Sequence, residues 1–362
     1  MFVLSKLVQS EELMKKLGFG IIGLGSISNV HATAIKEIEG CRLVAGFHLR
    51  EERANEFAKK HNCRAYTDLD AFLADPEIDI VTIASPSGLH LDGALASAKA
   101  KKHLIVEKPL EITKERCNQI IKACVENNVR LAGIFHSRYH EAPQLIKKAI
   151  EQGRFGKIVM ADAQVKWFRS QEYYDSGAWR GTWDLDGGGA LMNQSIHAID
   201  LLHWFMGDVA ELFAFTDTLS HERIEVEDTG VAALRFASGA LGVIEGTTSA
   251  YPGFLKKLEI LGTKGSVVME EESITFWKFE EERPEDQAIR DKYLTGTATG
   301  GGASDPMAMG HHGHTKLFSA FVDAIRDNAE VPITGESARD AVEIIEAIYK
   351  SARSGKKVTL PL

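Results

Sequence analysis

The first third of the chain alternates short apolar runs with helical patterns, and this alternation restricts the possible folds more than any other feature of the sequence. Runs typical of buried strands cover residues 19–22, 42–47, 78–84, 103–106 and 130–134. Amphipathic patterns typical of helices lie between them, at 27–38, 51–61, 89–100 and 114–127. Strands separated by helices of this length form βαβ units, so we expect a parallel sheet covered by helices.

The pattern changes after about residue 141. Helices are predicted at 142–152, 190–206, 315–327 and 337–354, but strands now follow one another, at 159–168, 211–218, 229–236, 240–249, 256–261, 265–270 and 273–277. Short turns between consecutive strands indicate an antiparallel sheet, and one face of such a sheet can stay open. Residues 1–16 are interpreted as an N-terminal extension, and the glycine-rich segment 295–313 as a flexible loop.

We therefore predict an α/β protein with two domains. An N-terminal Rossmann dinucleotide-binding domain would span 17–141, and a C-terminal α+β domain with an open, mostly antiparallel sheet would span 142–362. A chain of 362 residues is long enough for two cores.

Composition excludes several classes of function. The net charge is -9, with acidic and basic residues interspersed, so we expect neither nucleic-acid binding nor binding to an anionic membrane. No apolar run reaches the length of about 18 residues that a transmembrane helix needs. The four cysteines form no CxxC pair and suit no zinc site, and we interpret them as reduced thiols of a cytoplasmic protein.

The segment after the first strand predicts a nucleotide site. Gly23 and Gly25 would form a tight turn that lets a pyrophosphate approach the backbone, with Ser26 and Ile27 opening the helix whose N-terminus favours negative charge. Ser28 occupies the third small position. A purely structural glycine turn is the alternative interpretation.

The end of the second strand departs from the pattern for NAD selection. An acidic residue there would bind the adenosine ribose, but the sequence has His48, followed by Arg50. A cation at this place can accept a 2′-phosphate, so NAD and NADP both stay open.

Further candidate residues follow later strands of the same sheet. Ligands of open parallel sheets lie beyond the carboxyl ends of the strands, which places Ser85 and Pro86 at the cofactor, with His90 close by. Glu107 and Lys108 follow the next strand and should lie on the same rim. The alternative for Lys108 is a surface salt bridge to Glu107.

The Gly-x-Gly turn, SPSGLH at 85–90, EKP at 107–109 and GGGALMNQSIHAID at 187–200 together resemble the glucose-fructose oxidoreductase / inositol dehydrogenase / MocA (Gfo/Idh/MocA) family over residues 17–362. The resemblance implies an NAD(P)-dependent dehydrogenase, with a slight lean to NAD. It also implies that Lys108 and His197 correspond to the lysine and the histidine of the family's active site. Pro109 corresponds to a family proline whose preceding peptide bond is often cis, and Asn193 stands where the family has an acidic residue. The stretch WRGTW…DGGGALMNQ, from residue 179, resembles the subgroup of UDP-sugar-acid 3-dehydrogenases.

The chemistry of alcohol oxidation agrees with these residues. A nicotinamide takes a hydride from carbon, and a side chain must take the hydroxyl proton. A lysine in a partly dry cleft has a lowered pKa, so we assign the proton to Lys108 and a hydrogen bond on the hydroxyl to His197. Asn193 lies four residues before His197, on the same helix face, but it lacks the charge of a carboxylate. Asp200 is a candidate compensating acid, with a purely structural role as the favoured alternative. Gly187–Gly189 would let a substrate approach the backbone.

The loop at 166–189 is the predicted substrate site. Trp179 could stack on a sugar ring, and Arg169 and Arg180 could hold a carboxylate or phosphate; packing against a neighbouring domain or subunit is the alternative. His136 and Arg138, after the last strand of the first domain, are expected to face the cleft. The histidines of HHGH at 311–314 more plausibly start a helix than bind metal, so we expect no metal site.

The predicted function is hydride transfer between NAD(P) and a secondary hydroxyl of a sugar, sugar acid, cyclitol or nucleotide sugar. Two alternatives share the fold: a glycosidase that uses transient oxidation by bound NAD, and a non-catalytic NAD(P)-sensing regulator. The resemblance also implies a homo-oligomer, a dimer or tetramer, formed through the C-terminal sheet.

Overall fold

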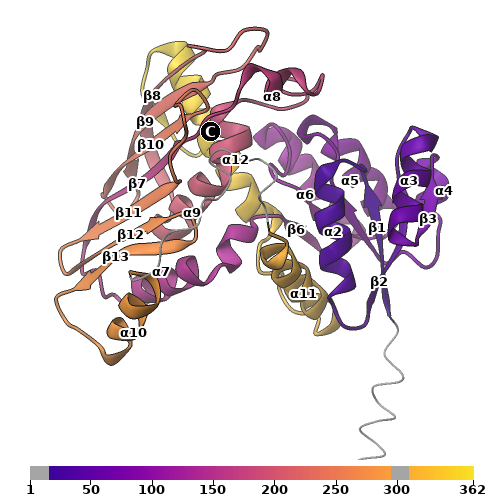
Figure 1. Ribbon diagram of the computed structural model, residues 1–362, viewed down its shortest axis with the longest axis horizontal. Helices are drawn as coiled ribbons and strands as arrows, with labels where there is room; N and C mark the ends of the chain where they lie inside the picture. Colours follow the sequence, from indigo (N-terminus) through magenta and orange to yellow (C-terminus); the bar gives the residue numbers. More distant parts are fainter. Residues whose placement is uncertain (1–15, 295–309) are drawn as a thin grey trace, which may run out of the picture.

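The computed structural model describes residues 16–294 and 310–362, which form two β-sheets (Figure 1). The first sheet has six parallel strands in the order β3-β2-β1-β4-β5-β6. The strands are β1 (Leu17–Ile22), β2 (Cys41–Phe47), β3 (Arg64–Tyr66), β4 (Ile80–Ile83), β5 (His103–Val106) and β6 (Leu131–Gly133). The order reverses between β1 and β4, as in a dinucleotide-binding fold, which confirms the predicted Rossmann sheet.

Helices connect these strands as the sequence predicts. They are α2 (Ser26–Lys36), α3 (Glu51–His61), α5 (His90–Lys99) and α6 (Lys114–Asn127). Short elements were missed: β3, α4 (Leu69–Leu73) and the 3₁₀ turns η1 (Ser87–Leu89) and η2 (His136–Tyr139). These elements are three to five residues long, so none contains a full period of apolar residues that a pattern could reveal.

The second sheet has eight strands in the order β13-β12-β11-β7-β10-β9-β8-β14. They are β7 (Ile158–Lys166), β8 (Val209–Asp217), β9 (Thr229–Phe236), β10 (Leu241–Thr247), β11 (Lys257–Gly262), β12 (Gly265–Glu270), β13 (Ser273–Phe279) and β14 (Val358–Thr359). Two antiparallel three-stranded units, β8–β10 and β11–β13, flank β7, which pairs parallel with β10 and antiparallel with β11. The sheet is therefore mostly antiparallel, as predicted, but it is not one continuous meander.

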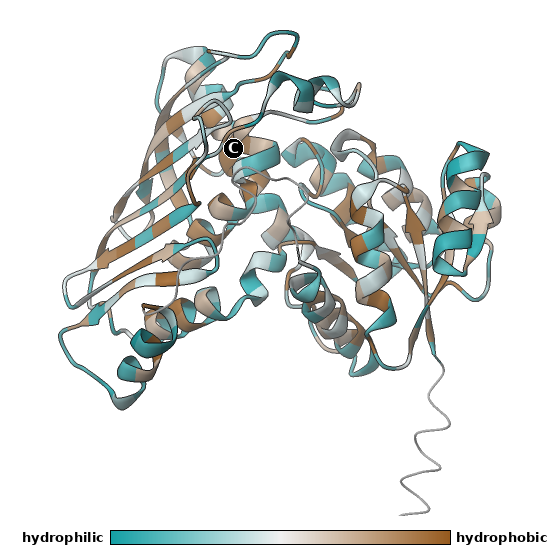
Figure 2. Ribbon diagram, viewed as in Figure 1, coloured by the Kyte–Doolittle hydropathy of each residue, from teal (hydrophilic) through white to brown (hydrophobic). Residues whose placement is uncertain are grey.

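Helices cover one face of this sheet, while Figure 1 shows no helix on the other. The C-terminal helices are α7 (Glu141–Glu151), α8 (Gln171–Asp175), α9 (Ile196–Met206), α10 (Pro284–Tyr293), α11 (His312–Arg326) and α12 (Gly335–Ser354). The helix predicted at 190–206 begins instead with a π-helical turn, η3 (Ala190–Ser195). Polar and apolar residues alternate along the strands (Figure 2), as expected for a sheet with one buried face.

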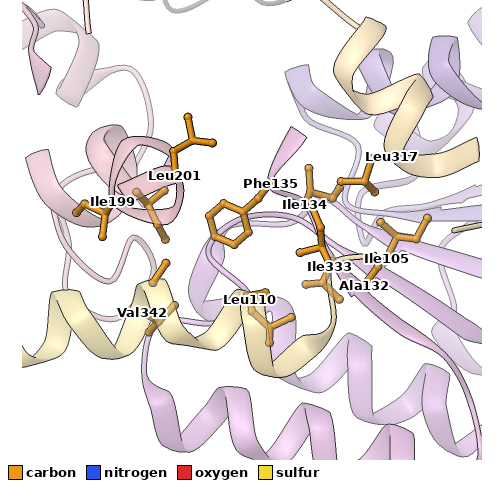
Figure 3. Close-up of a cluster of buried hydrophobic side chains, with 14 of the residues drawn as sticks. Ile105, Leu110, Ala132, Ile134, Phe135, Ile199, Leu201, Leu317, Ile333 and Val342 are labelled. Atoms are coloured by element: carbon orange, nitrogen blue, oxygen red, sulfur yellow. The ribbon is translucent and has the colours of Figure 1, made fainter. Parts of the chain in front are cut away.

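The last two helices return to the first sheet. Helix α11 packs on α2, and α12 packs on α6 as well as on β8. The rings of Phe19 and Phe318 stack at 6.1 Å, and Gly133 N–H donates to the Ile333 carbonyl at 3.2 Å. Figure 3 shows the shared core, in which side chains of β5, β6, α9, α11 and α12 meet. The two halves thus have one continuous hydrophobic core, and the domain boundary at 141/142 stays a prediction.

Other predictions fall partly outside the described ranges. The N-terminal extension, apart from residue 16, and the glycine-rich loop up to residue 309 lie among residues that the structure does not describe. The HHGH segment does start a helix, since α11 begins at His312. Within the two described ranges, no helix combines the length and apolar character that crossing a bilayer requires.

Arg138 is not available to a substrate, contrary to the prediction. Its guanidinium donates to both carboxylate oxygens of Asp200, at 2.8 and 2.5 Å, and to Ser337 Oγ at 3.0 Å. Both members of the pair are buried, with exposed fractions of 5% and 1%. The pair joins η2 to α9, so Asp200 is not the acid that compensates for Asn193 either.

This buried pair predicts the outcome of a stability experiment. Arg138→Met should lower the free energy of unfolding by about 3–5 kcal/mol, because it leaves the Asp200 carboxylate buried without a cation. The double variant Arg138→Met, Asp200→Leu should recover most of the loss. Chemical unfolding followed by tryptophan fluorescence measures both. Unchanged stability of Arg138→Met, with loss of substrate affinity alone, would restore the original assignment.

Candidate active site

A cavity of about 1630 Å³ lies between the two halves, at the carboxyl ends of β1, β2, β4 and β5. Most residues predicted from the sequence line it: Gly23, Gly25, Ser26, Ile27, His48, Arg50, Ser85, Pro86, Glu107, Lys108, His136, Arg169, Trp179, Arg180, Asn193 and His197. Their roles stay predictions, but their convergence on one space is a property of the fold.

The turn after β1 leaves open space in front of α2. Gly23 has a φ of 87°, and a Cβ there would lie 2.4 Å from Ser85 N, so only glycine fits. A Cβ on Gly25, by contrast, would meet nothing within 4 Å. No side chain caps the N-terminus of α2, and the buried Ser28 hydroxyl donates to the Gly25 carbonyl at 2.6 Å. Free backbone N–H groups and empty space at a helix N-terminus fit a pyrophosphate.

The cavity continues to the end of β2, where no carboxylate follows the strand. His48 Nδ1 accepts the Arg50 backbone N–H at 2.9 Å, which shapes the turn. Arg50 and Arg53 both line this end, and neither forms an ion pair with any residue of the described ranges. A ribose with either a 2′-hydroxyl or a 2′-phosphate fits this arrangement.

His90 does not line the cavity, so its prediction as a cofactor-binding residue was wrong. It is 1% exposed, and its two ring nitrogens lie 3.0 Å from the Pro109 carbonyl and 2.9 Å from the Ser85 carbonyl. The imidazole therefore joins two loops of the rim. The Lys108–Pro109 bond that it supports is cis.

Glu107 faces a buried cluster of histidines behind the rim. Its Oε1 lies 2.9 Å from His31 Nε2 and 3.4 Å from His314 Nε2, and Thr82 Oγ1 lies 3.0 Å from His31 Nδ1. Burial alone would raise the pKa of Glu107, but the hydrogen bonds from the two imidazoles hold it well below its usual range. His31, Glu107 and His314 are close enough to hold a metal ion, and Glu107 already contacts both imidazoles, while His314 Nδ1 has no hydrogen-bond partner among the described residues. The expectation of no metal stays a prediction.

Lys108 is half-buried where the two halves meet. Its Nζ donates to the Asn193 main-chain carbonyl at 2.8 Å, which links the end of β5 to η3. Burial lowers the pKa of the ammonium, the carboxylates of Glu107 and Asp186 partly oppose this shift, and the guanidiniums of Arg180 and Arg169 add to it. The alternative, a surface salt bridge to Glu107, does not describe this side chain, whose Nζ lies in the cavity wall and donates to a main-chain carbonyl.

His197 projects from the first turn of α9 into the same cavity. Burial holds the pKa of His197 well below its usual value, and the charges of Lys108 and Lys256 lower it further. The ring is therefore neutral near pH 7. It packs edge-on against His136, with centroids 4.6 Å apart, and its Nδ1 has no hydrogen-bond partner among the described residues.

Asn193 is held by residues that the sequence did not single out. Its Nδ2 donates to Asp186 Oδ1, and its Oδ1 accepts from Gln194 Nε2 at 2.9 Å. Burial raises the pKa of Asp186 to about 6, although Gly181 N–H also donates to its carboxylate at 2.9 Å. In the sequence, the only feature that could have pointed to Asp186 is that it directly precedes Gly187–Gly189.

The glycines at 187–189 do not make room for a substrate. A Cβ would lie 2.5 Å from Ile112 Cγ2 on Gly187, 2.1 Å from the Tyr349 hydroxyl on Gly188 and 1.9 Å from the Glu227 carbonyl oxygen on Gly189. None of the three lines the cavity. These glycines let the chain before η3 pack closely against its neighbours, so the prediction that they make room for a substrate was wrong.

The aromatic loop places two guanidiniums around one tyrosine. Arg180 lies 4.3 Å from the Tyr173 ring centroid and 4.5 Å from that of Trp179, and it donates to the Tyr173 hydroxyl at 2.6 Å. Arg169 lies 5.6 Å from the same Tyr173 ring. No carboxylate among the described residues forms an ion pair with Arg180. This corner of the cavity suits an anionic group.

Two family models match this chain. The model of an oxidoreductase family with an NAD-binding Rossmann fold matches residues 17–135, and that of the GFO/IDH/MocA C-terminal domain matches residues 144–268. A myo-inositol 2-dehydrogenase from Thermotoga maritima is 32% identical over 255 residues, which cover 68% of this chain and 73% of that protein.

Solved structures agree over nearly the whole length. The WlbA dehydrogenase from Bordetella pertussis, in complex with NADH and UDP-GlcNAcA, is 38% identical, with a TM-score of 0.87 over 96% of this chain and 99% of that chain. A levoglucosan dehydrogenase in complex with NADH and L-sorbose is 27% identical, with a TM-score of 0.82 over 96% and 100% of the two chains. The chain belongs to the Gfo/Idh/MocA family of NAD-binding oxidoreductases.

Proposed function

We propose that this protein is an NAD-dependent dehydrogenase that oxidises a secondary hydroxyl of an anionic sugar, in the first place a nucleotide-linked sugar acid. The observation that carries the proposal is the meeting of Lys108 and His197 in a cavity that begins at a nucleotide-binding turn. The WlbA dehydrogenase, similar in fold and sequence, was solved with NADH and such a sugar. Arg169 and Arg180 give this chain a place for the anionic group.

The cofactor fits the residues present. Gly23, Gly25 and the N-terminus of α2 would hold the pyrophosphate, Ser85 and Pro86 would border the nucleotide, and Glu107 and Lys108 would lie at the nicotinamide. His48 and Arg50 would lie at the adenosine ribose. We propose NAD as the main cofactor, since the similar structures contain NADH, while the two arginines of this end would also tolerate NADP.

In the proposed reaction, the side chains of the protein accept the proton of the substrate hydroxyl. When bound, the nicotinamide supplies the acceptor for the hydride that leaves the carbinol carbon. Lys108 Nζ, as a neutral amine, takes the hydroxyl proton, so that the carbonyl forms as the O–H and C–H bonds break. A lowered pKa makes the amine available. The neutral His197 hydrogen-bonds the hydroxyl and orients it, and Asn193 keeps Lys108 in place through its carbonyl.

We also propose that a second copy covers the open face of the C-terminal sheet. Phe213 and Phe215 of β8 point to this face and pair across the strands with Ala233 and Val231 of β9. Phe215 is 71% exposed, and apolar side chains gathered on a sheet are typical of an interface. A cytoplasmic location is proposed from the four cysteines, all of which are free thiols.

The glycine turn gives a test of cofactor binding. Gly25→Ala should fold with an unchanged thermal midpoint, because its Cβ meets no protein atom, but should weaken NADH binding at least about tenfold by blocking the pyrophosphate. Gly23→Ala should instead lower the midpoint itself. Fluorescence titration with NADH and NADPH measures the affinities. Full NADH affinity in Gly25→Ala would place the cofactor elsewhere.

The central test concerns Lys108. Lys108→Met should lower kcat for oxidation of UDP-GlcNAcA on the order of a thousand-fold, because no other group takes the proton, while NADH binding persists. Lys122→Met, on the exposed face of α6, is the matched control and should keep full activity. Formation of reduced cofactor is followed by absorbance. Turnover that survives Lys108→Met would defeat the proposal.

If the open sheet face is the interface between copies, a charged substitution on it should weaken the oligomer. Phe215→Glu should reduce the molar mass measured by light scattering, because it places a charge in the interface. Val125→Glu, on the exposed side of α6, should leave the mass unchanged. A wild-type protein that is monomeric at all concentrations would contradict the proposed interface.

A further inference from the structure

Asp186 is a buried carboxylate directly behind the candidate active site. It is 2% exposed and does not line the cavity, whereas its partner Asn193 does. The carboxylate accepts hydrogen bonds from Gly181 N–H and from Asn193 Nδ2. No lysine, arginine or histidine of the described ranges forms an ion pair with it. A charge buried in this way is costly unless nearby groups compensate for it.

The contacts around Asn193 connect this carboxylate to Lys108. Both ends of the Asn193 amide are occupied, Nδ2 by Asp186 and Oδ1 by the Gln194 side chain, so the amide has one orientation. The main-chain carbonyl of the same residue accepts from Lys108 Nζ at 2.8 Å. One residue thus holds the buried carboxylate on one side and the ammonium on the other.

The charges around Lys108 show why the carboxylate of Asp186 affects the protonation of the lysine. The groups that face its ammonium are the guanidiniums of Arg169 and Arg180, the neutral imidazole of His197, and the carboxylates of Glu107 and Asp186. Glu107 is already engaged with His31 and His314. Asp186 is therefore a second negative charge, besides Glu107, that balances two guanidiniums and one ammonium in this corner.

We propose that Asp186 is a positioning residue of the dehydrogenase reaction: it fixes the Asn193 amide beside Lys108 and supplies, in addition to Glu107, a negative charge that balances the ammonium. The inference rests on the proposed role of Lys108. It gives the site a carboxylate even though Asn193, the residue that lines the cavity, has none. Asp186 acts through Asn193 and through its field, and does not touch the substrate.

The sign of the effect follows from the charge. A negative neighbour favours the ammonium form of a lysine, so removing it favours the neutral amine. Oxidation needs the neutral amine. The acid side of the pH profile for kcat/KM should therefore move to lower pH when Asp186 loses its charge.

The first experiment compares Asp186→Asn with wild type in oxidation of UDP-GlcNAcA. The acid limb should move down on the order of one pH unit. The exchange variant Asp186→Asn, Asn193→Asp returns a carboxylate to the site and should move the limb back toward the wild-type position. Asp184→Asn, in an exposed position of the same loop, is the matched control and should leave the profile unchanged. Lower kcat with an unmoved limb would show a merely structural role and overturn the inference.

A second measurement needs no turnover. NMR titration of isotope-labelled lysine side chains, with the Lys108 signal identified by its loss in Lys108→Met, should show a lower pKa for Lys108 in Asp186→Asn. If that variant does not fold, Asp186→Ser serves, because its hydroxyl can still accept the Gly181 N–H. An unchanged Lys108 pKa would overturn the inference alone, whereas full activity of Lys108→Met would overturn the proposed function.

Discussion

The hydrogen bond from Lys108 Nζ to the Asn193 carbonyl is the contact on which the site depends. Lys108 follows β5 of the parallel sheet, and Asn193 belongs to the π-helical turn before α9. Holding an ammonium at this junction requires both halves of the molecule in their observed places. The shared core beneath it, from β5 and β6 to α9, α11 and α12, keeps the halves in that relation.

The electrostatics of the site follow from burial rather than from a large net charge. Lys108 and His197 are both half-buried in the cavity wall, and desolvation lowers the pKa of each, which favours a neutral amine and a neutral imidazole. Carboxylates oppose this tendency at Lys108 from two directions, Glu107 beside it and Asp186 behind Asn193. The balance between desolvation and these charges sets the proton affinity that the chemistry needs.

Several residues that the sequence predicts to bind substrate or cofactor instead make contacts within the protein. The glycines at 187–189 admit Ile112, Tyr349 and Glu227 next to the backbone. Arg138 pairs with Asp200, and His90 joins the loops after β4 and β5. In each case the side chain or backbone is used within the protein.

The sequence by itself determined the parallel sheet, the glycine turn after its first strand and the rim position of Lys108, whereas His197 was assigned from the family resemblance. These features are local: the period of apolar residues shows strands and helices, and the end of a parallel strand shows where a ligand lies. Only the tertiary structure decided which partners these residues have. Asn193 meets Asp186 across the turn, Arg138 meets Asp200 from 62 residues away, and His31 meets Glu107 from 76 residues away. The insertion of β7 between two antiparallel units, and the return of α11 and α12 to the first sheet, are likewise decided by packing. Contacts between distant segments leave no periodic mark in either segment, so they become visible only when the chain is folded.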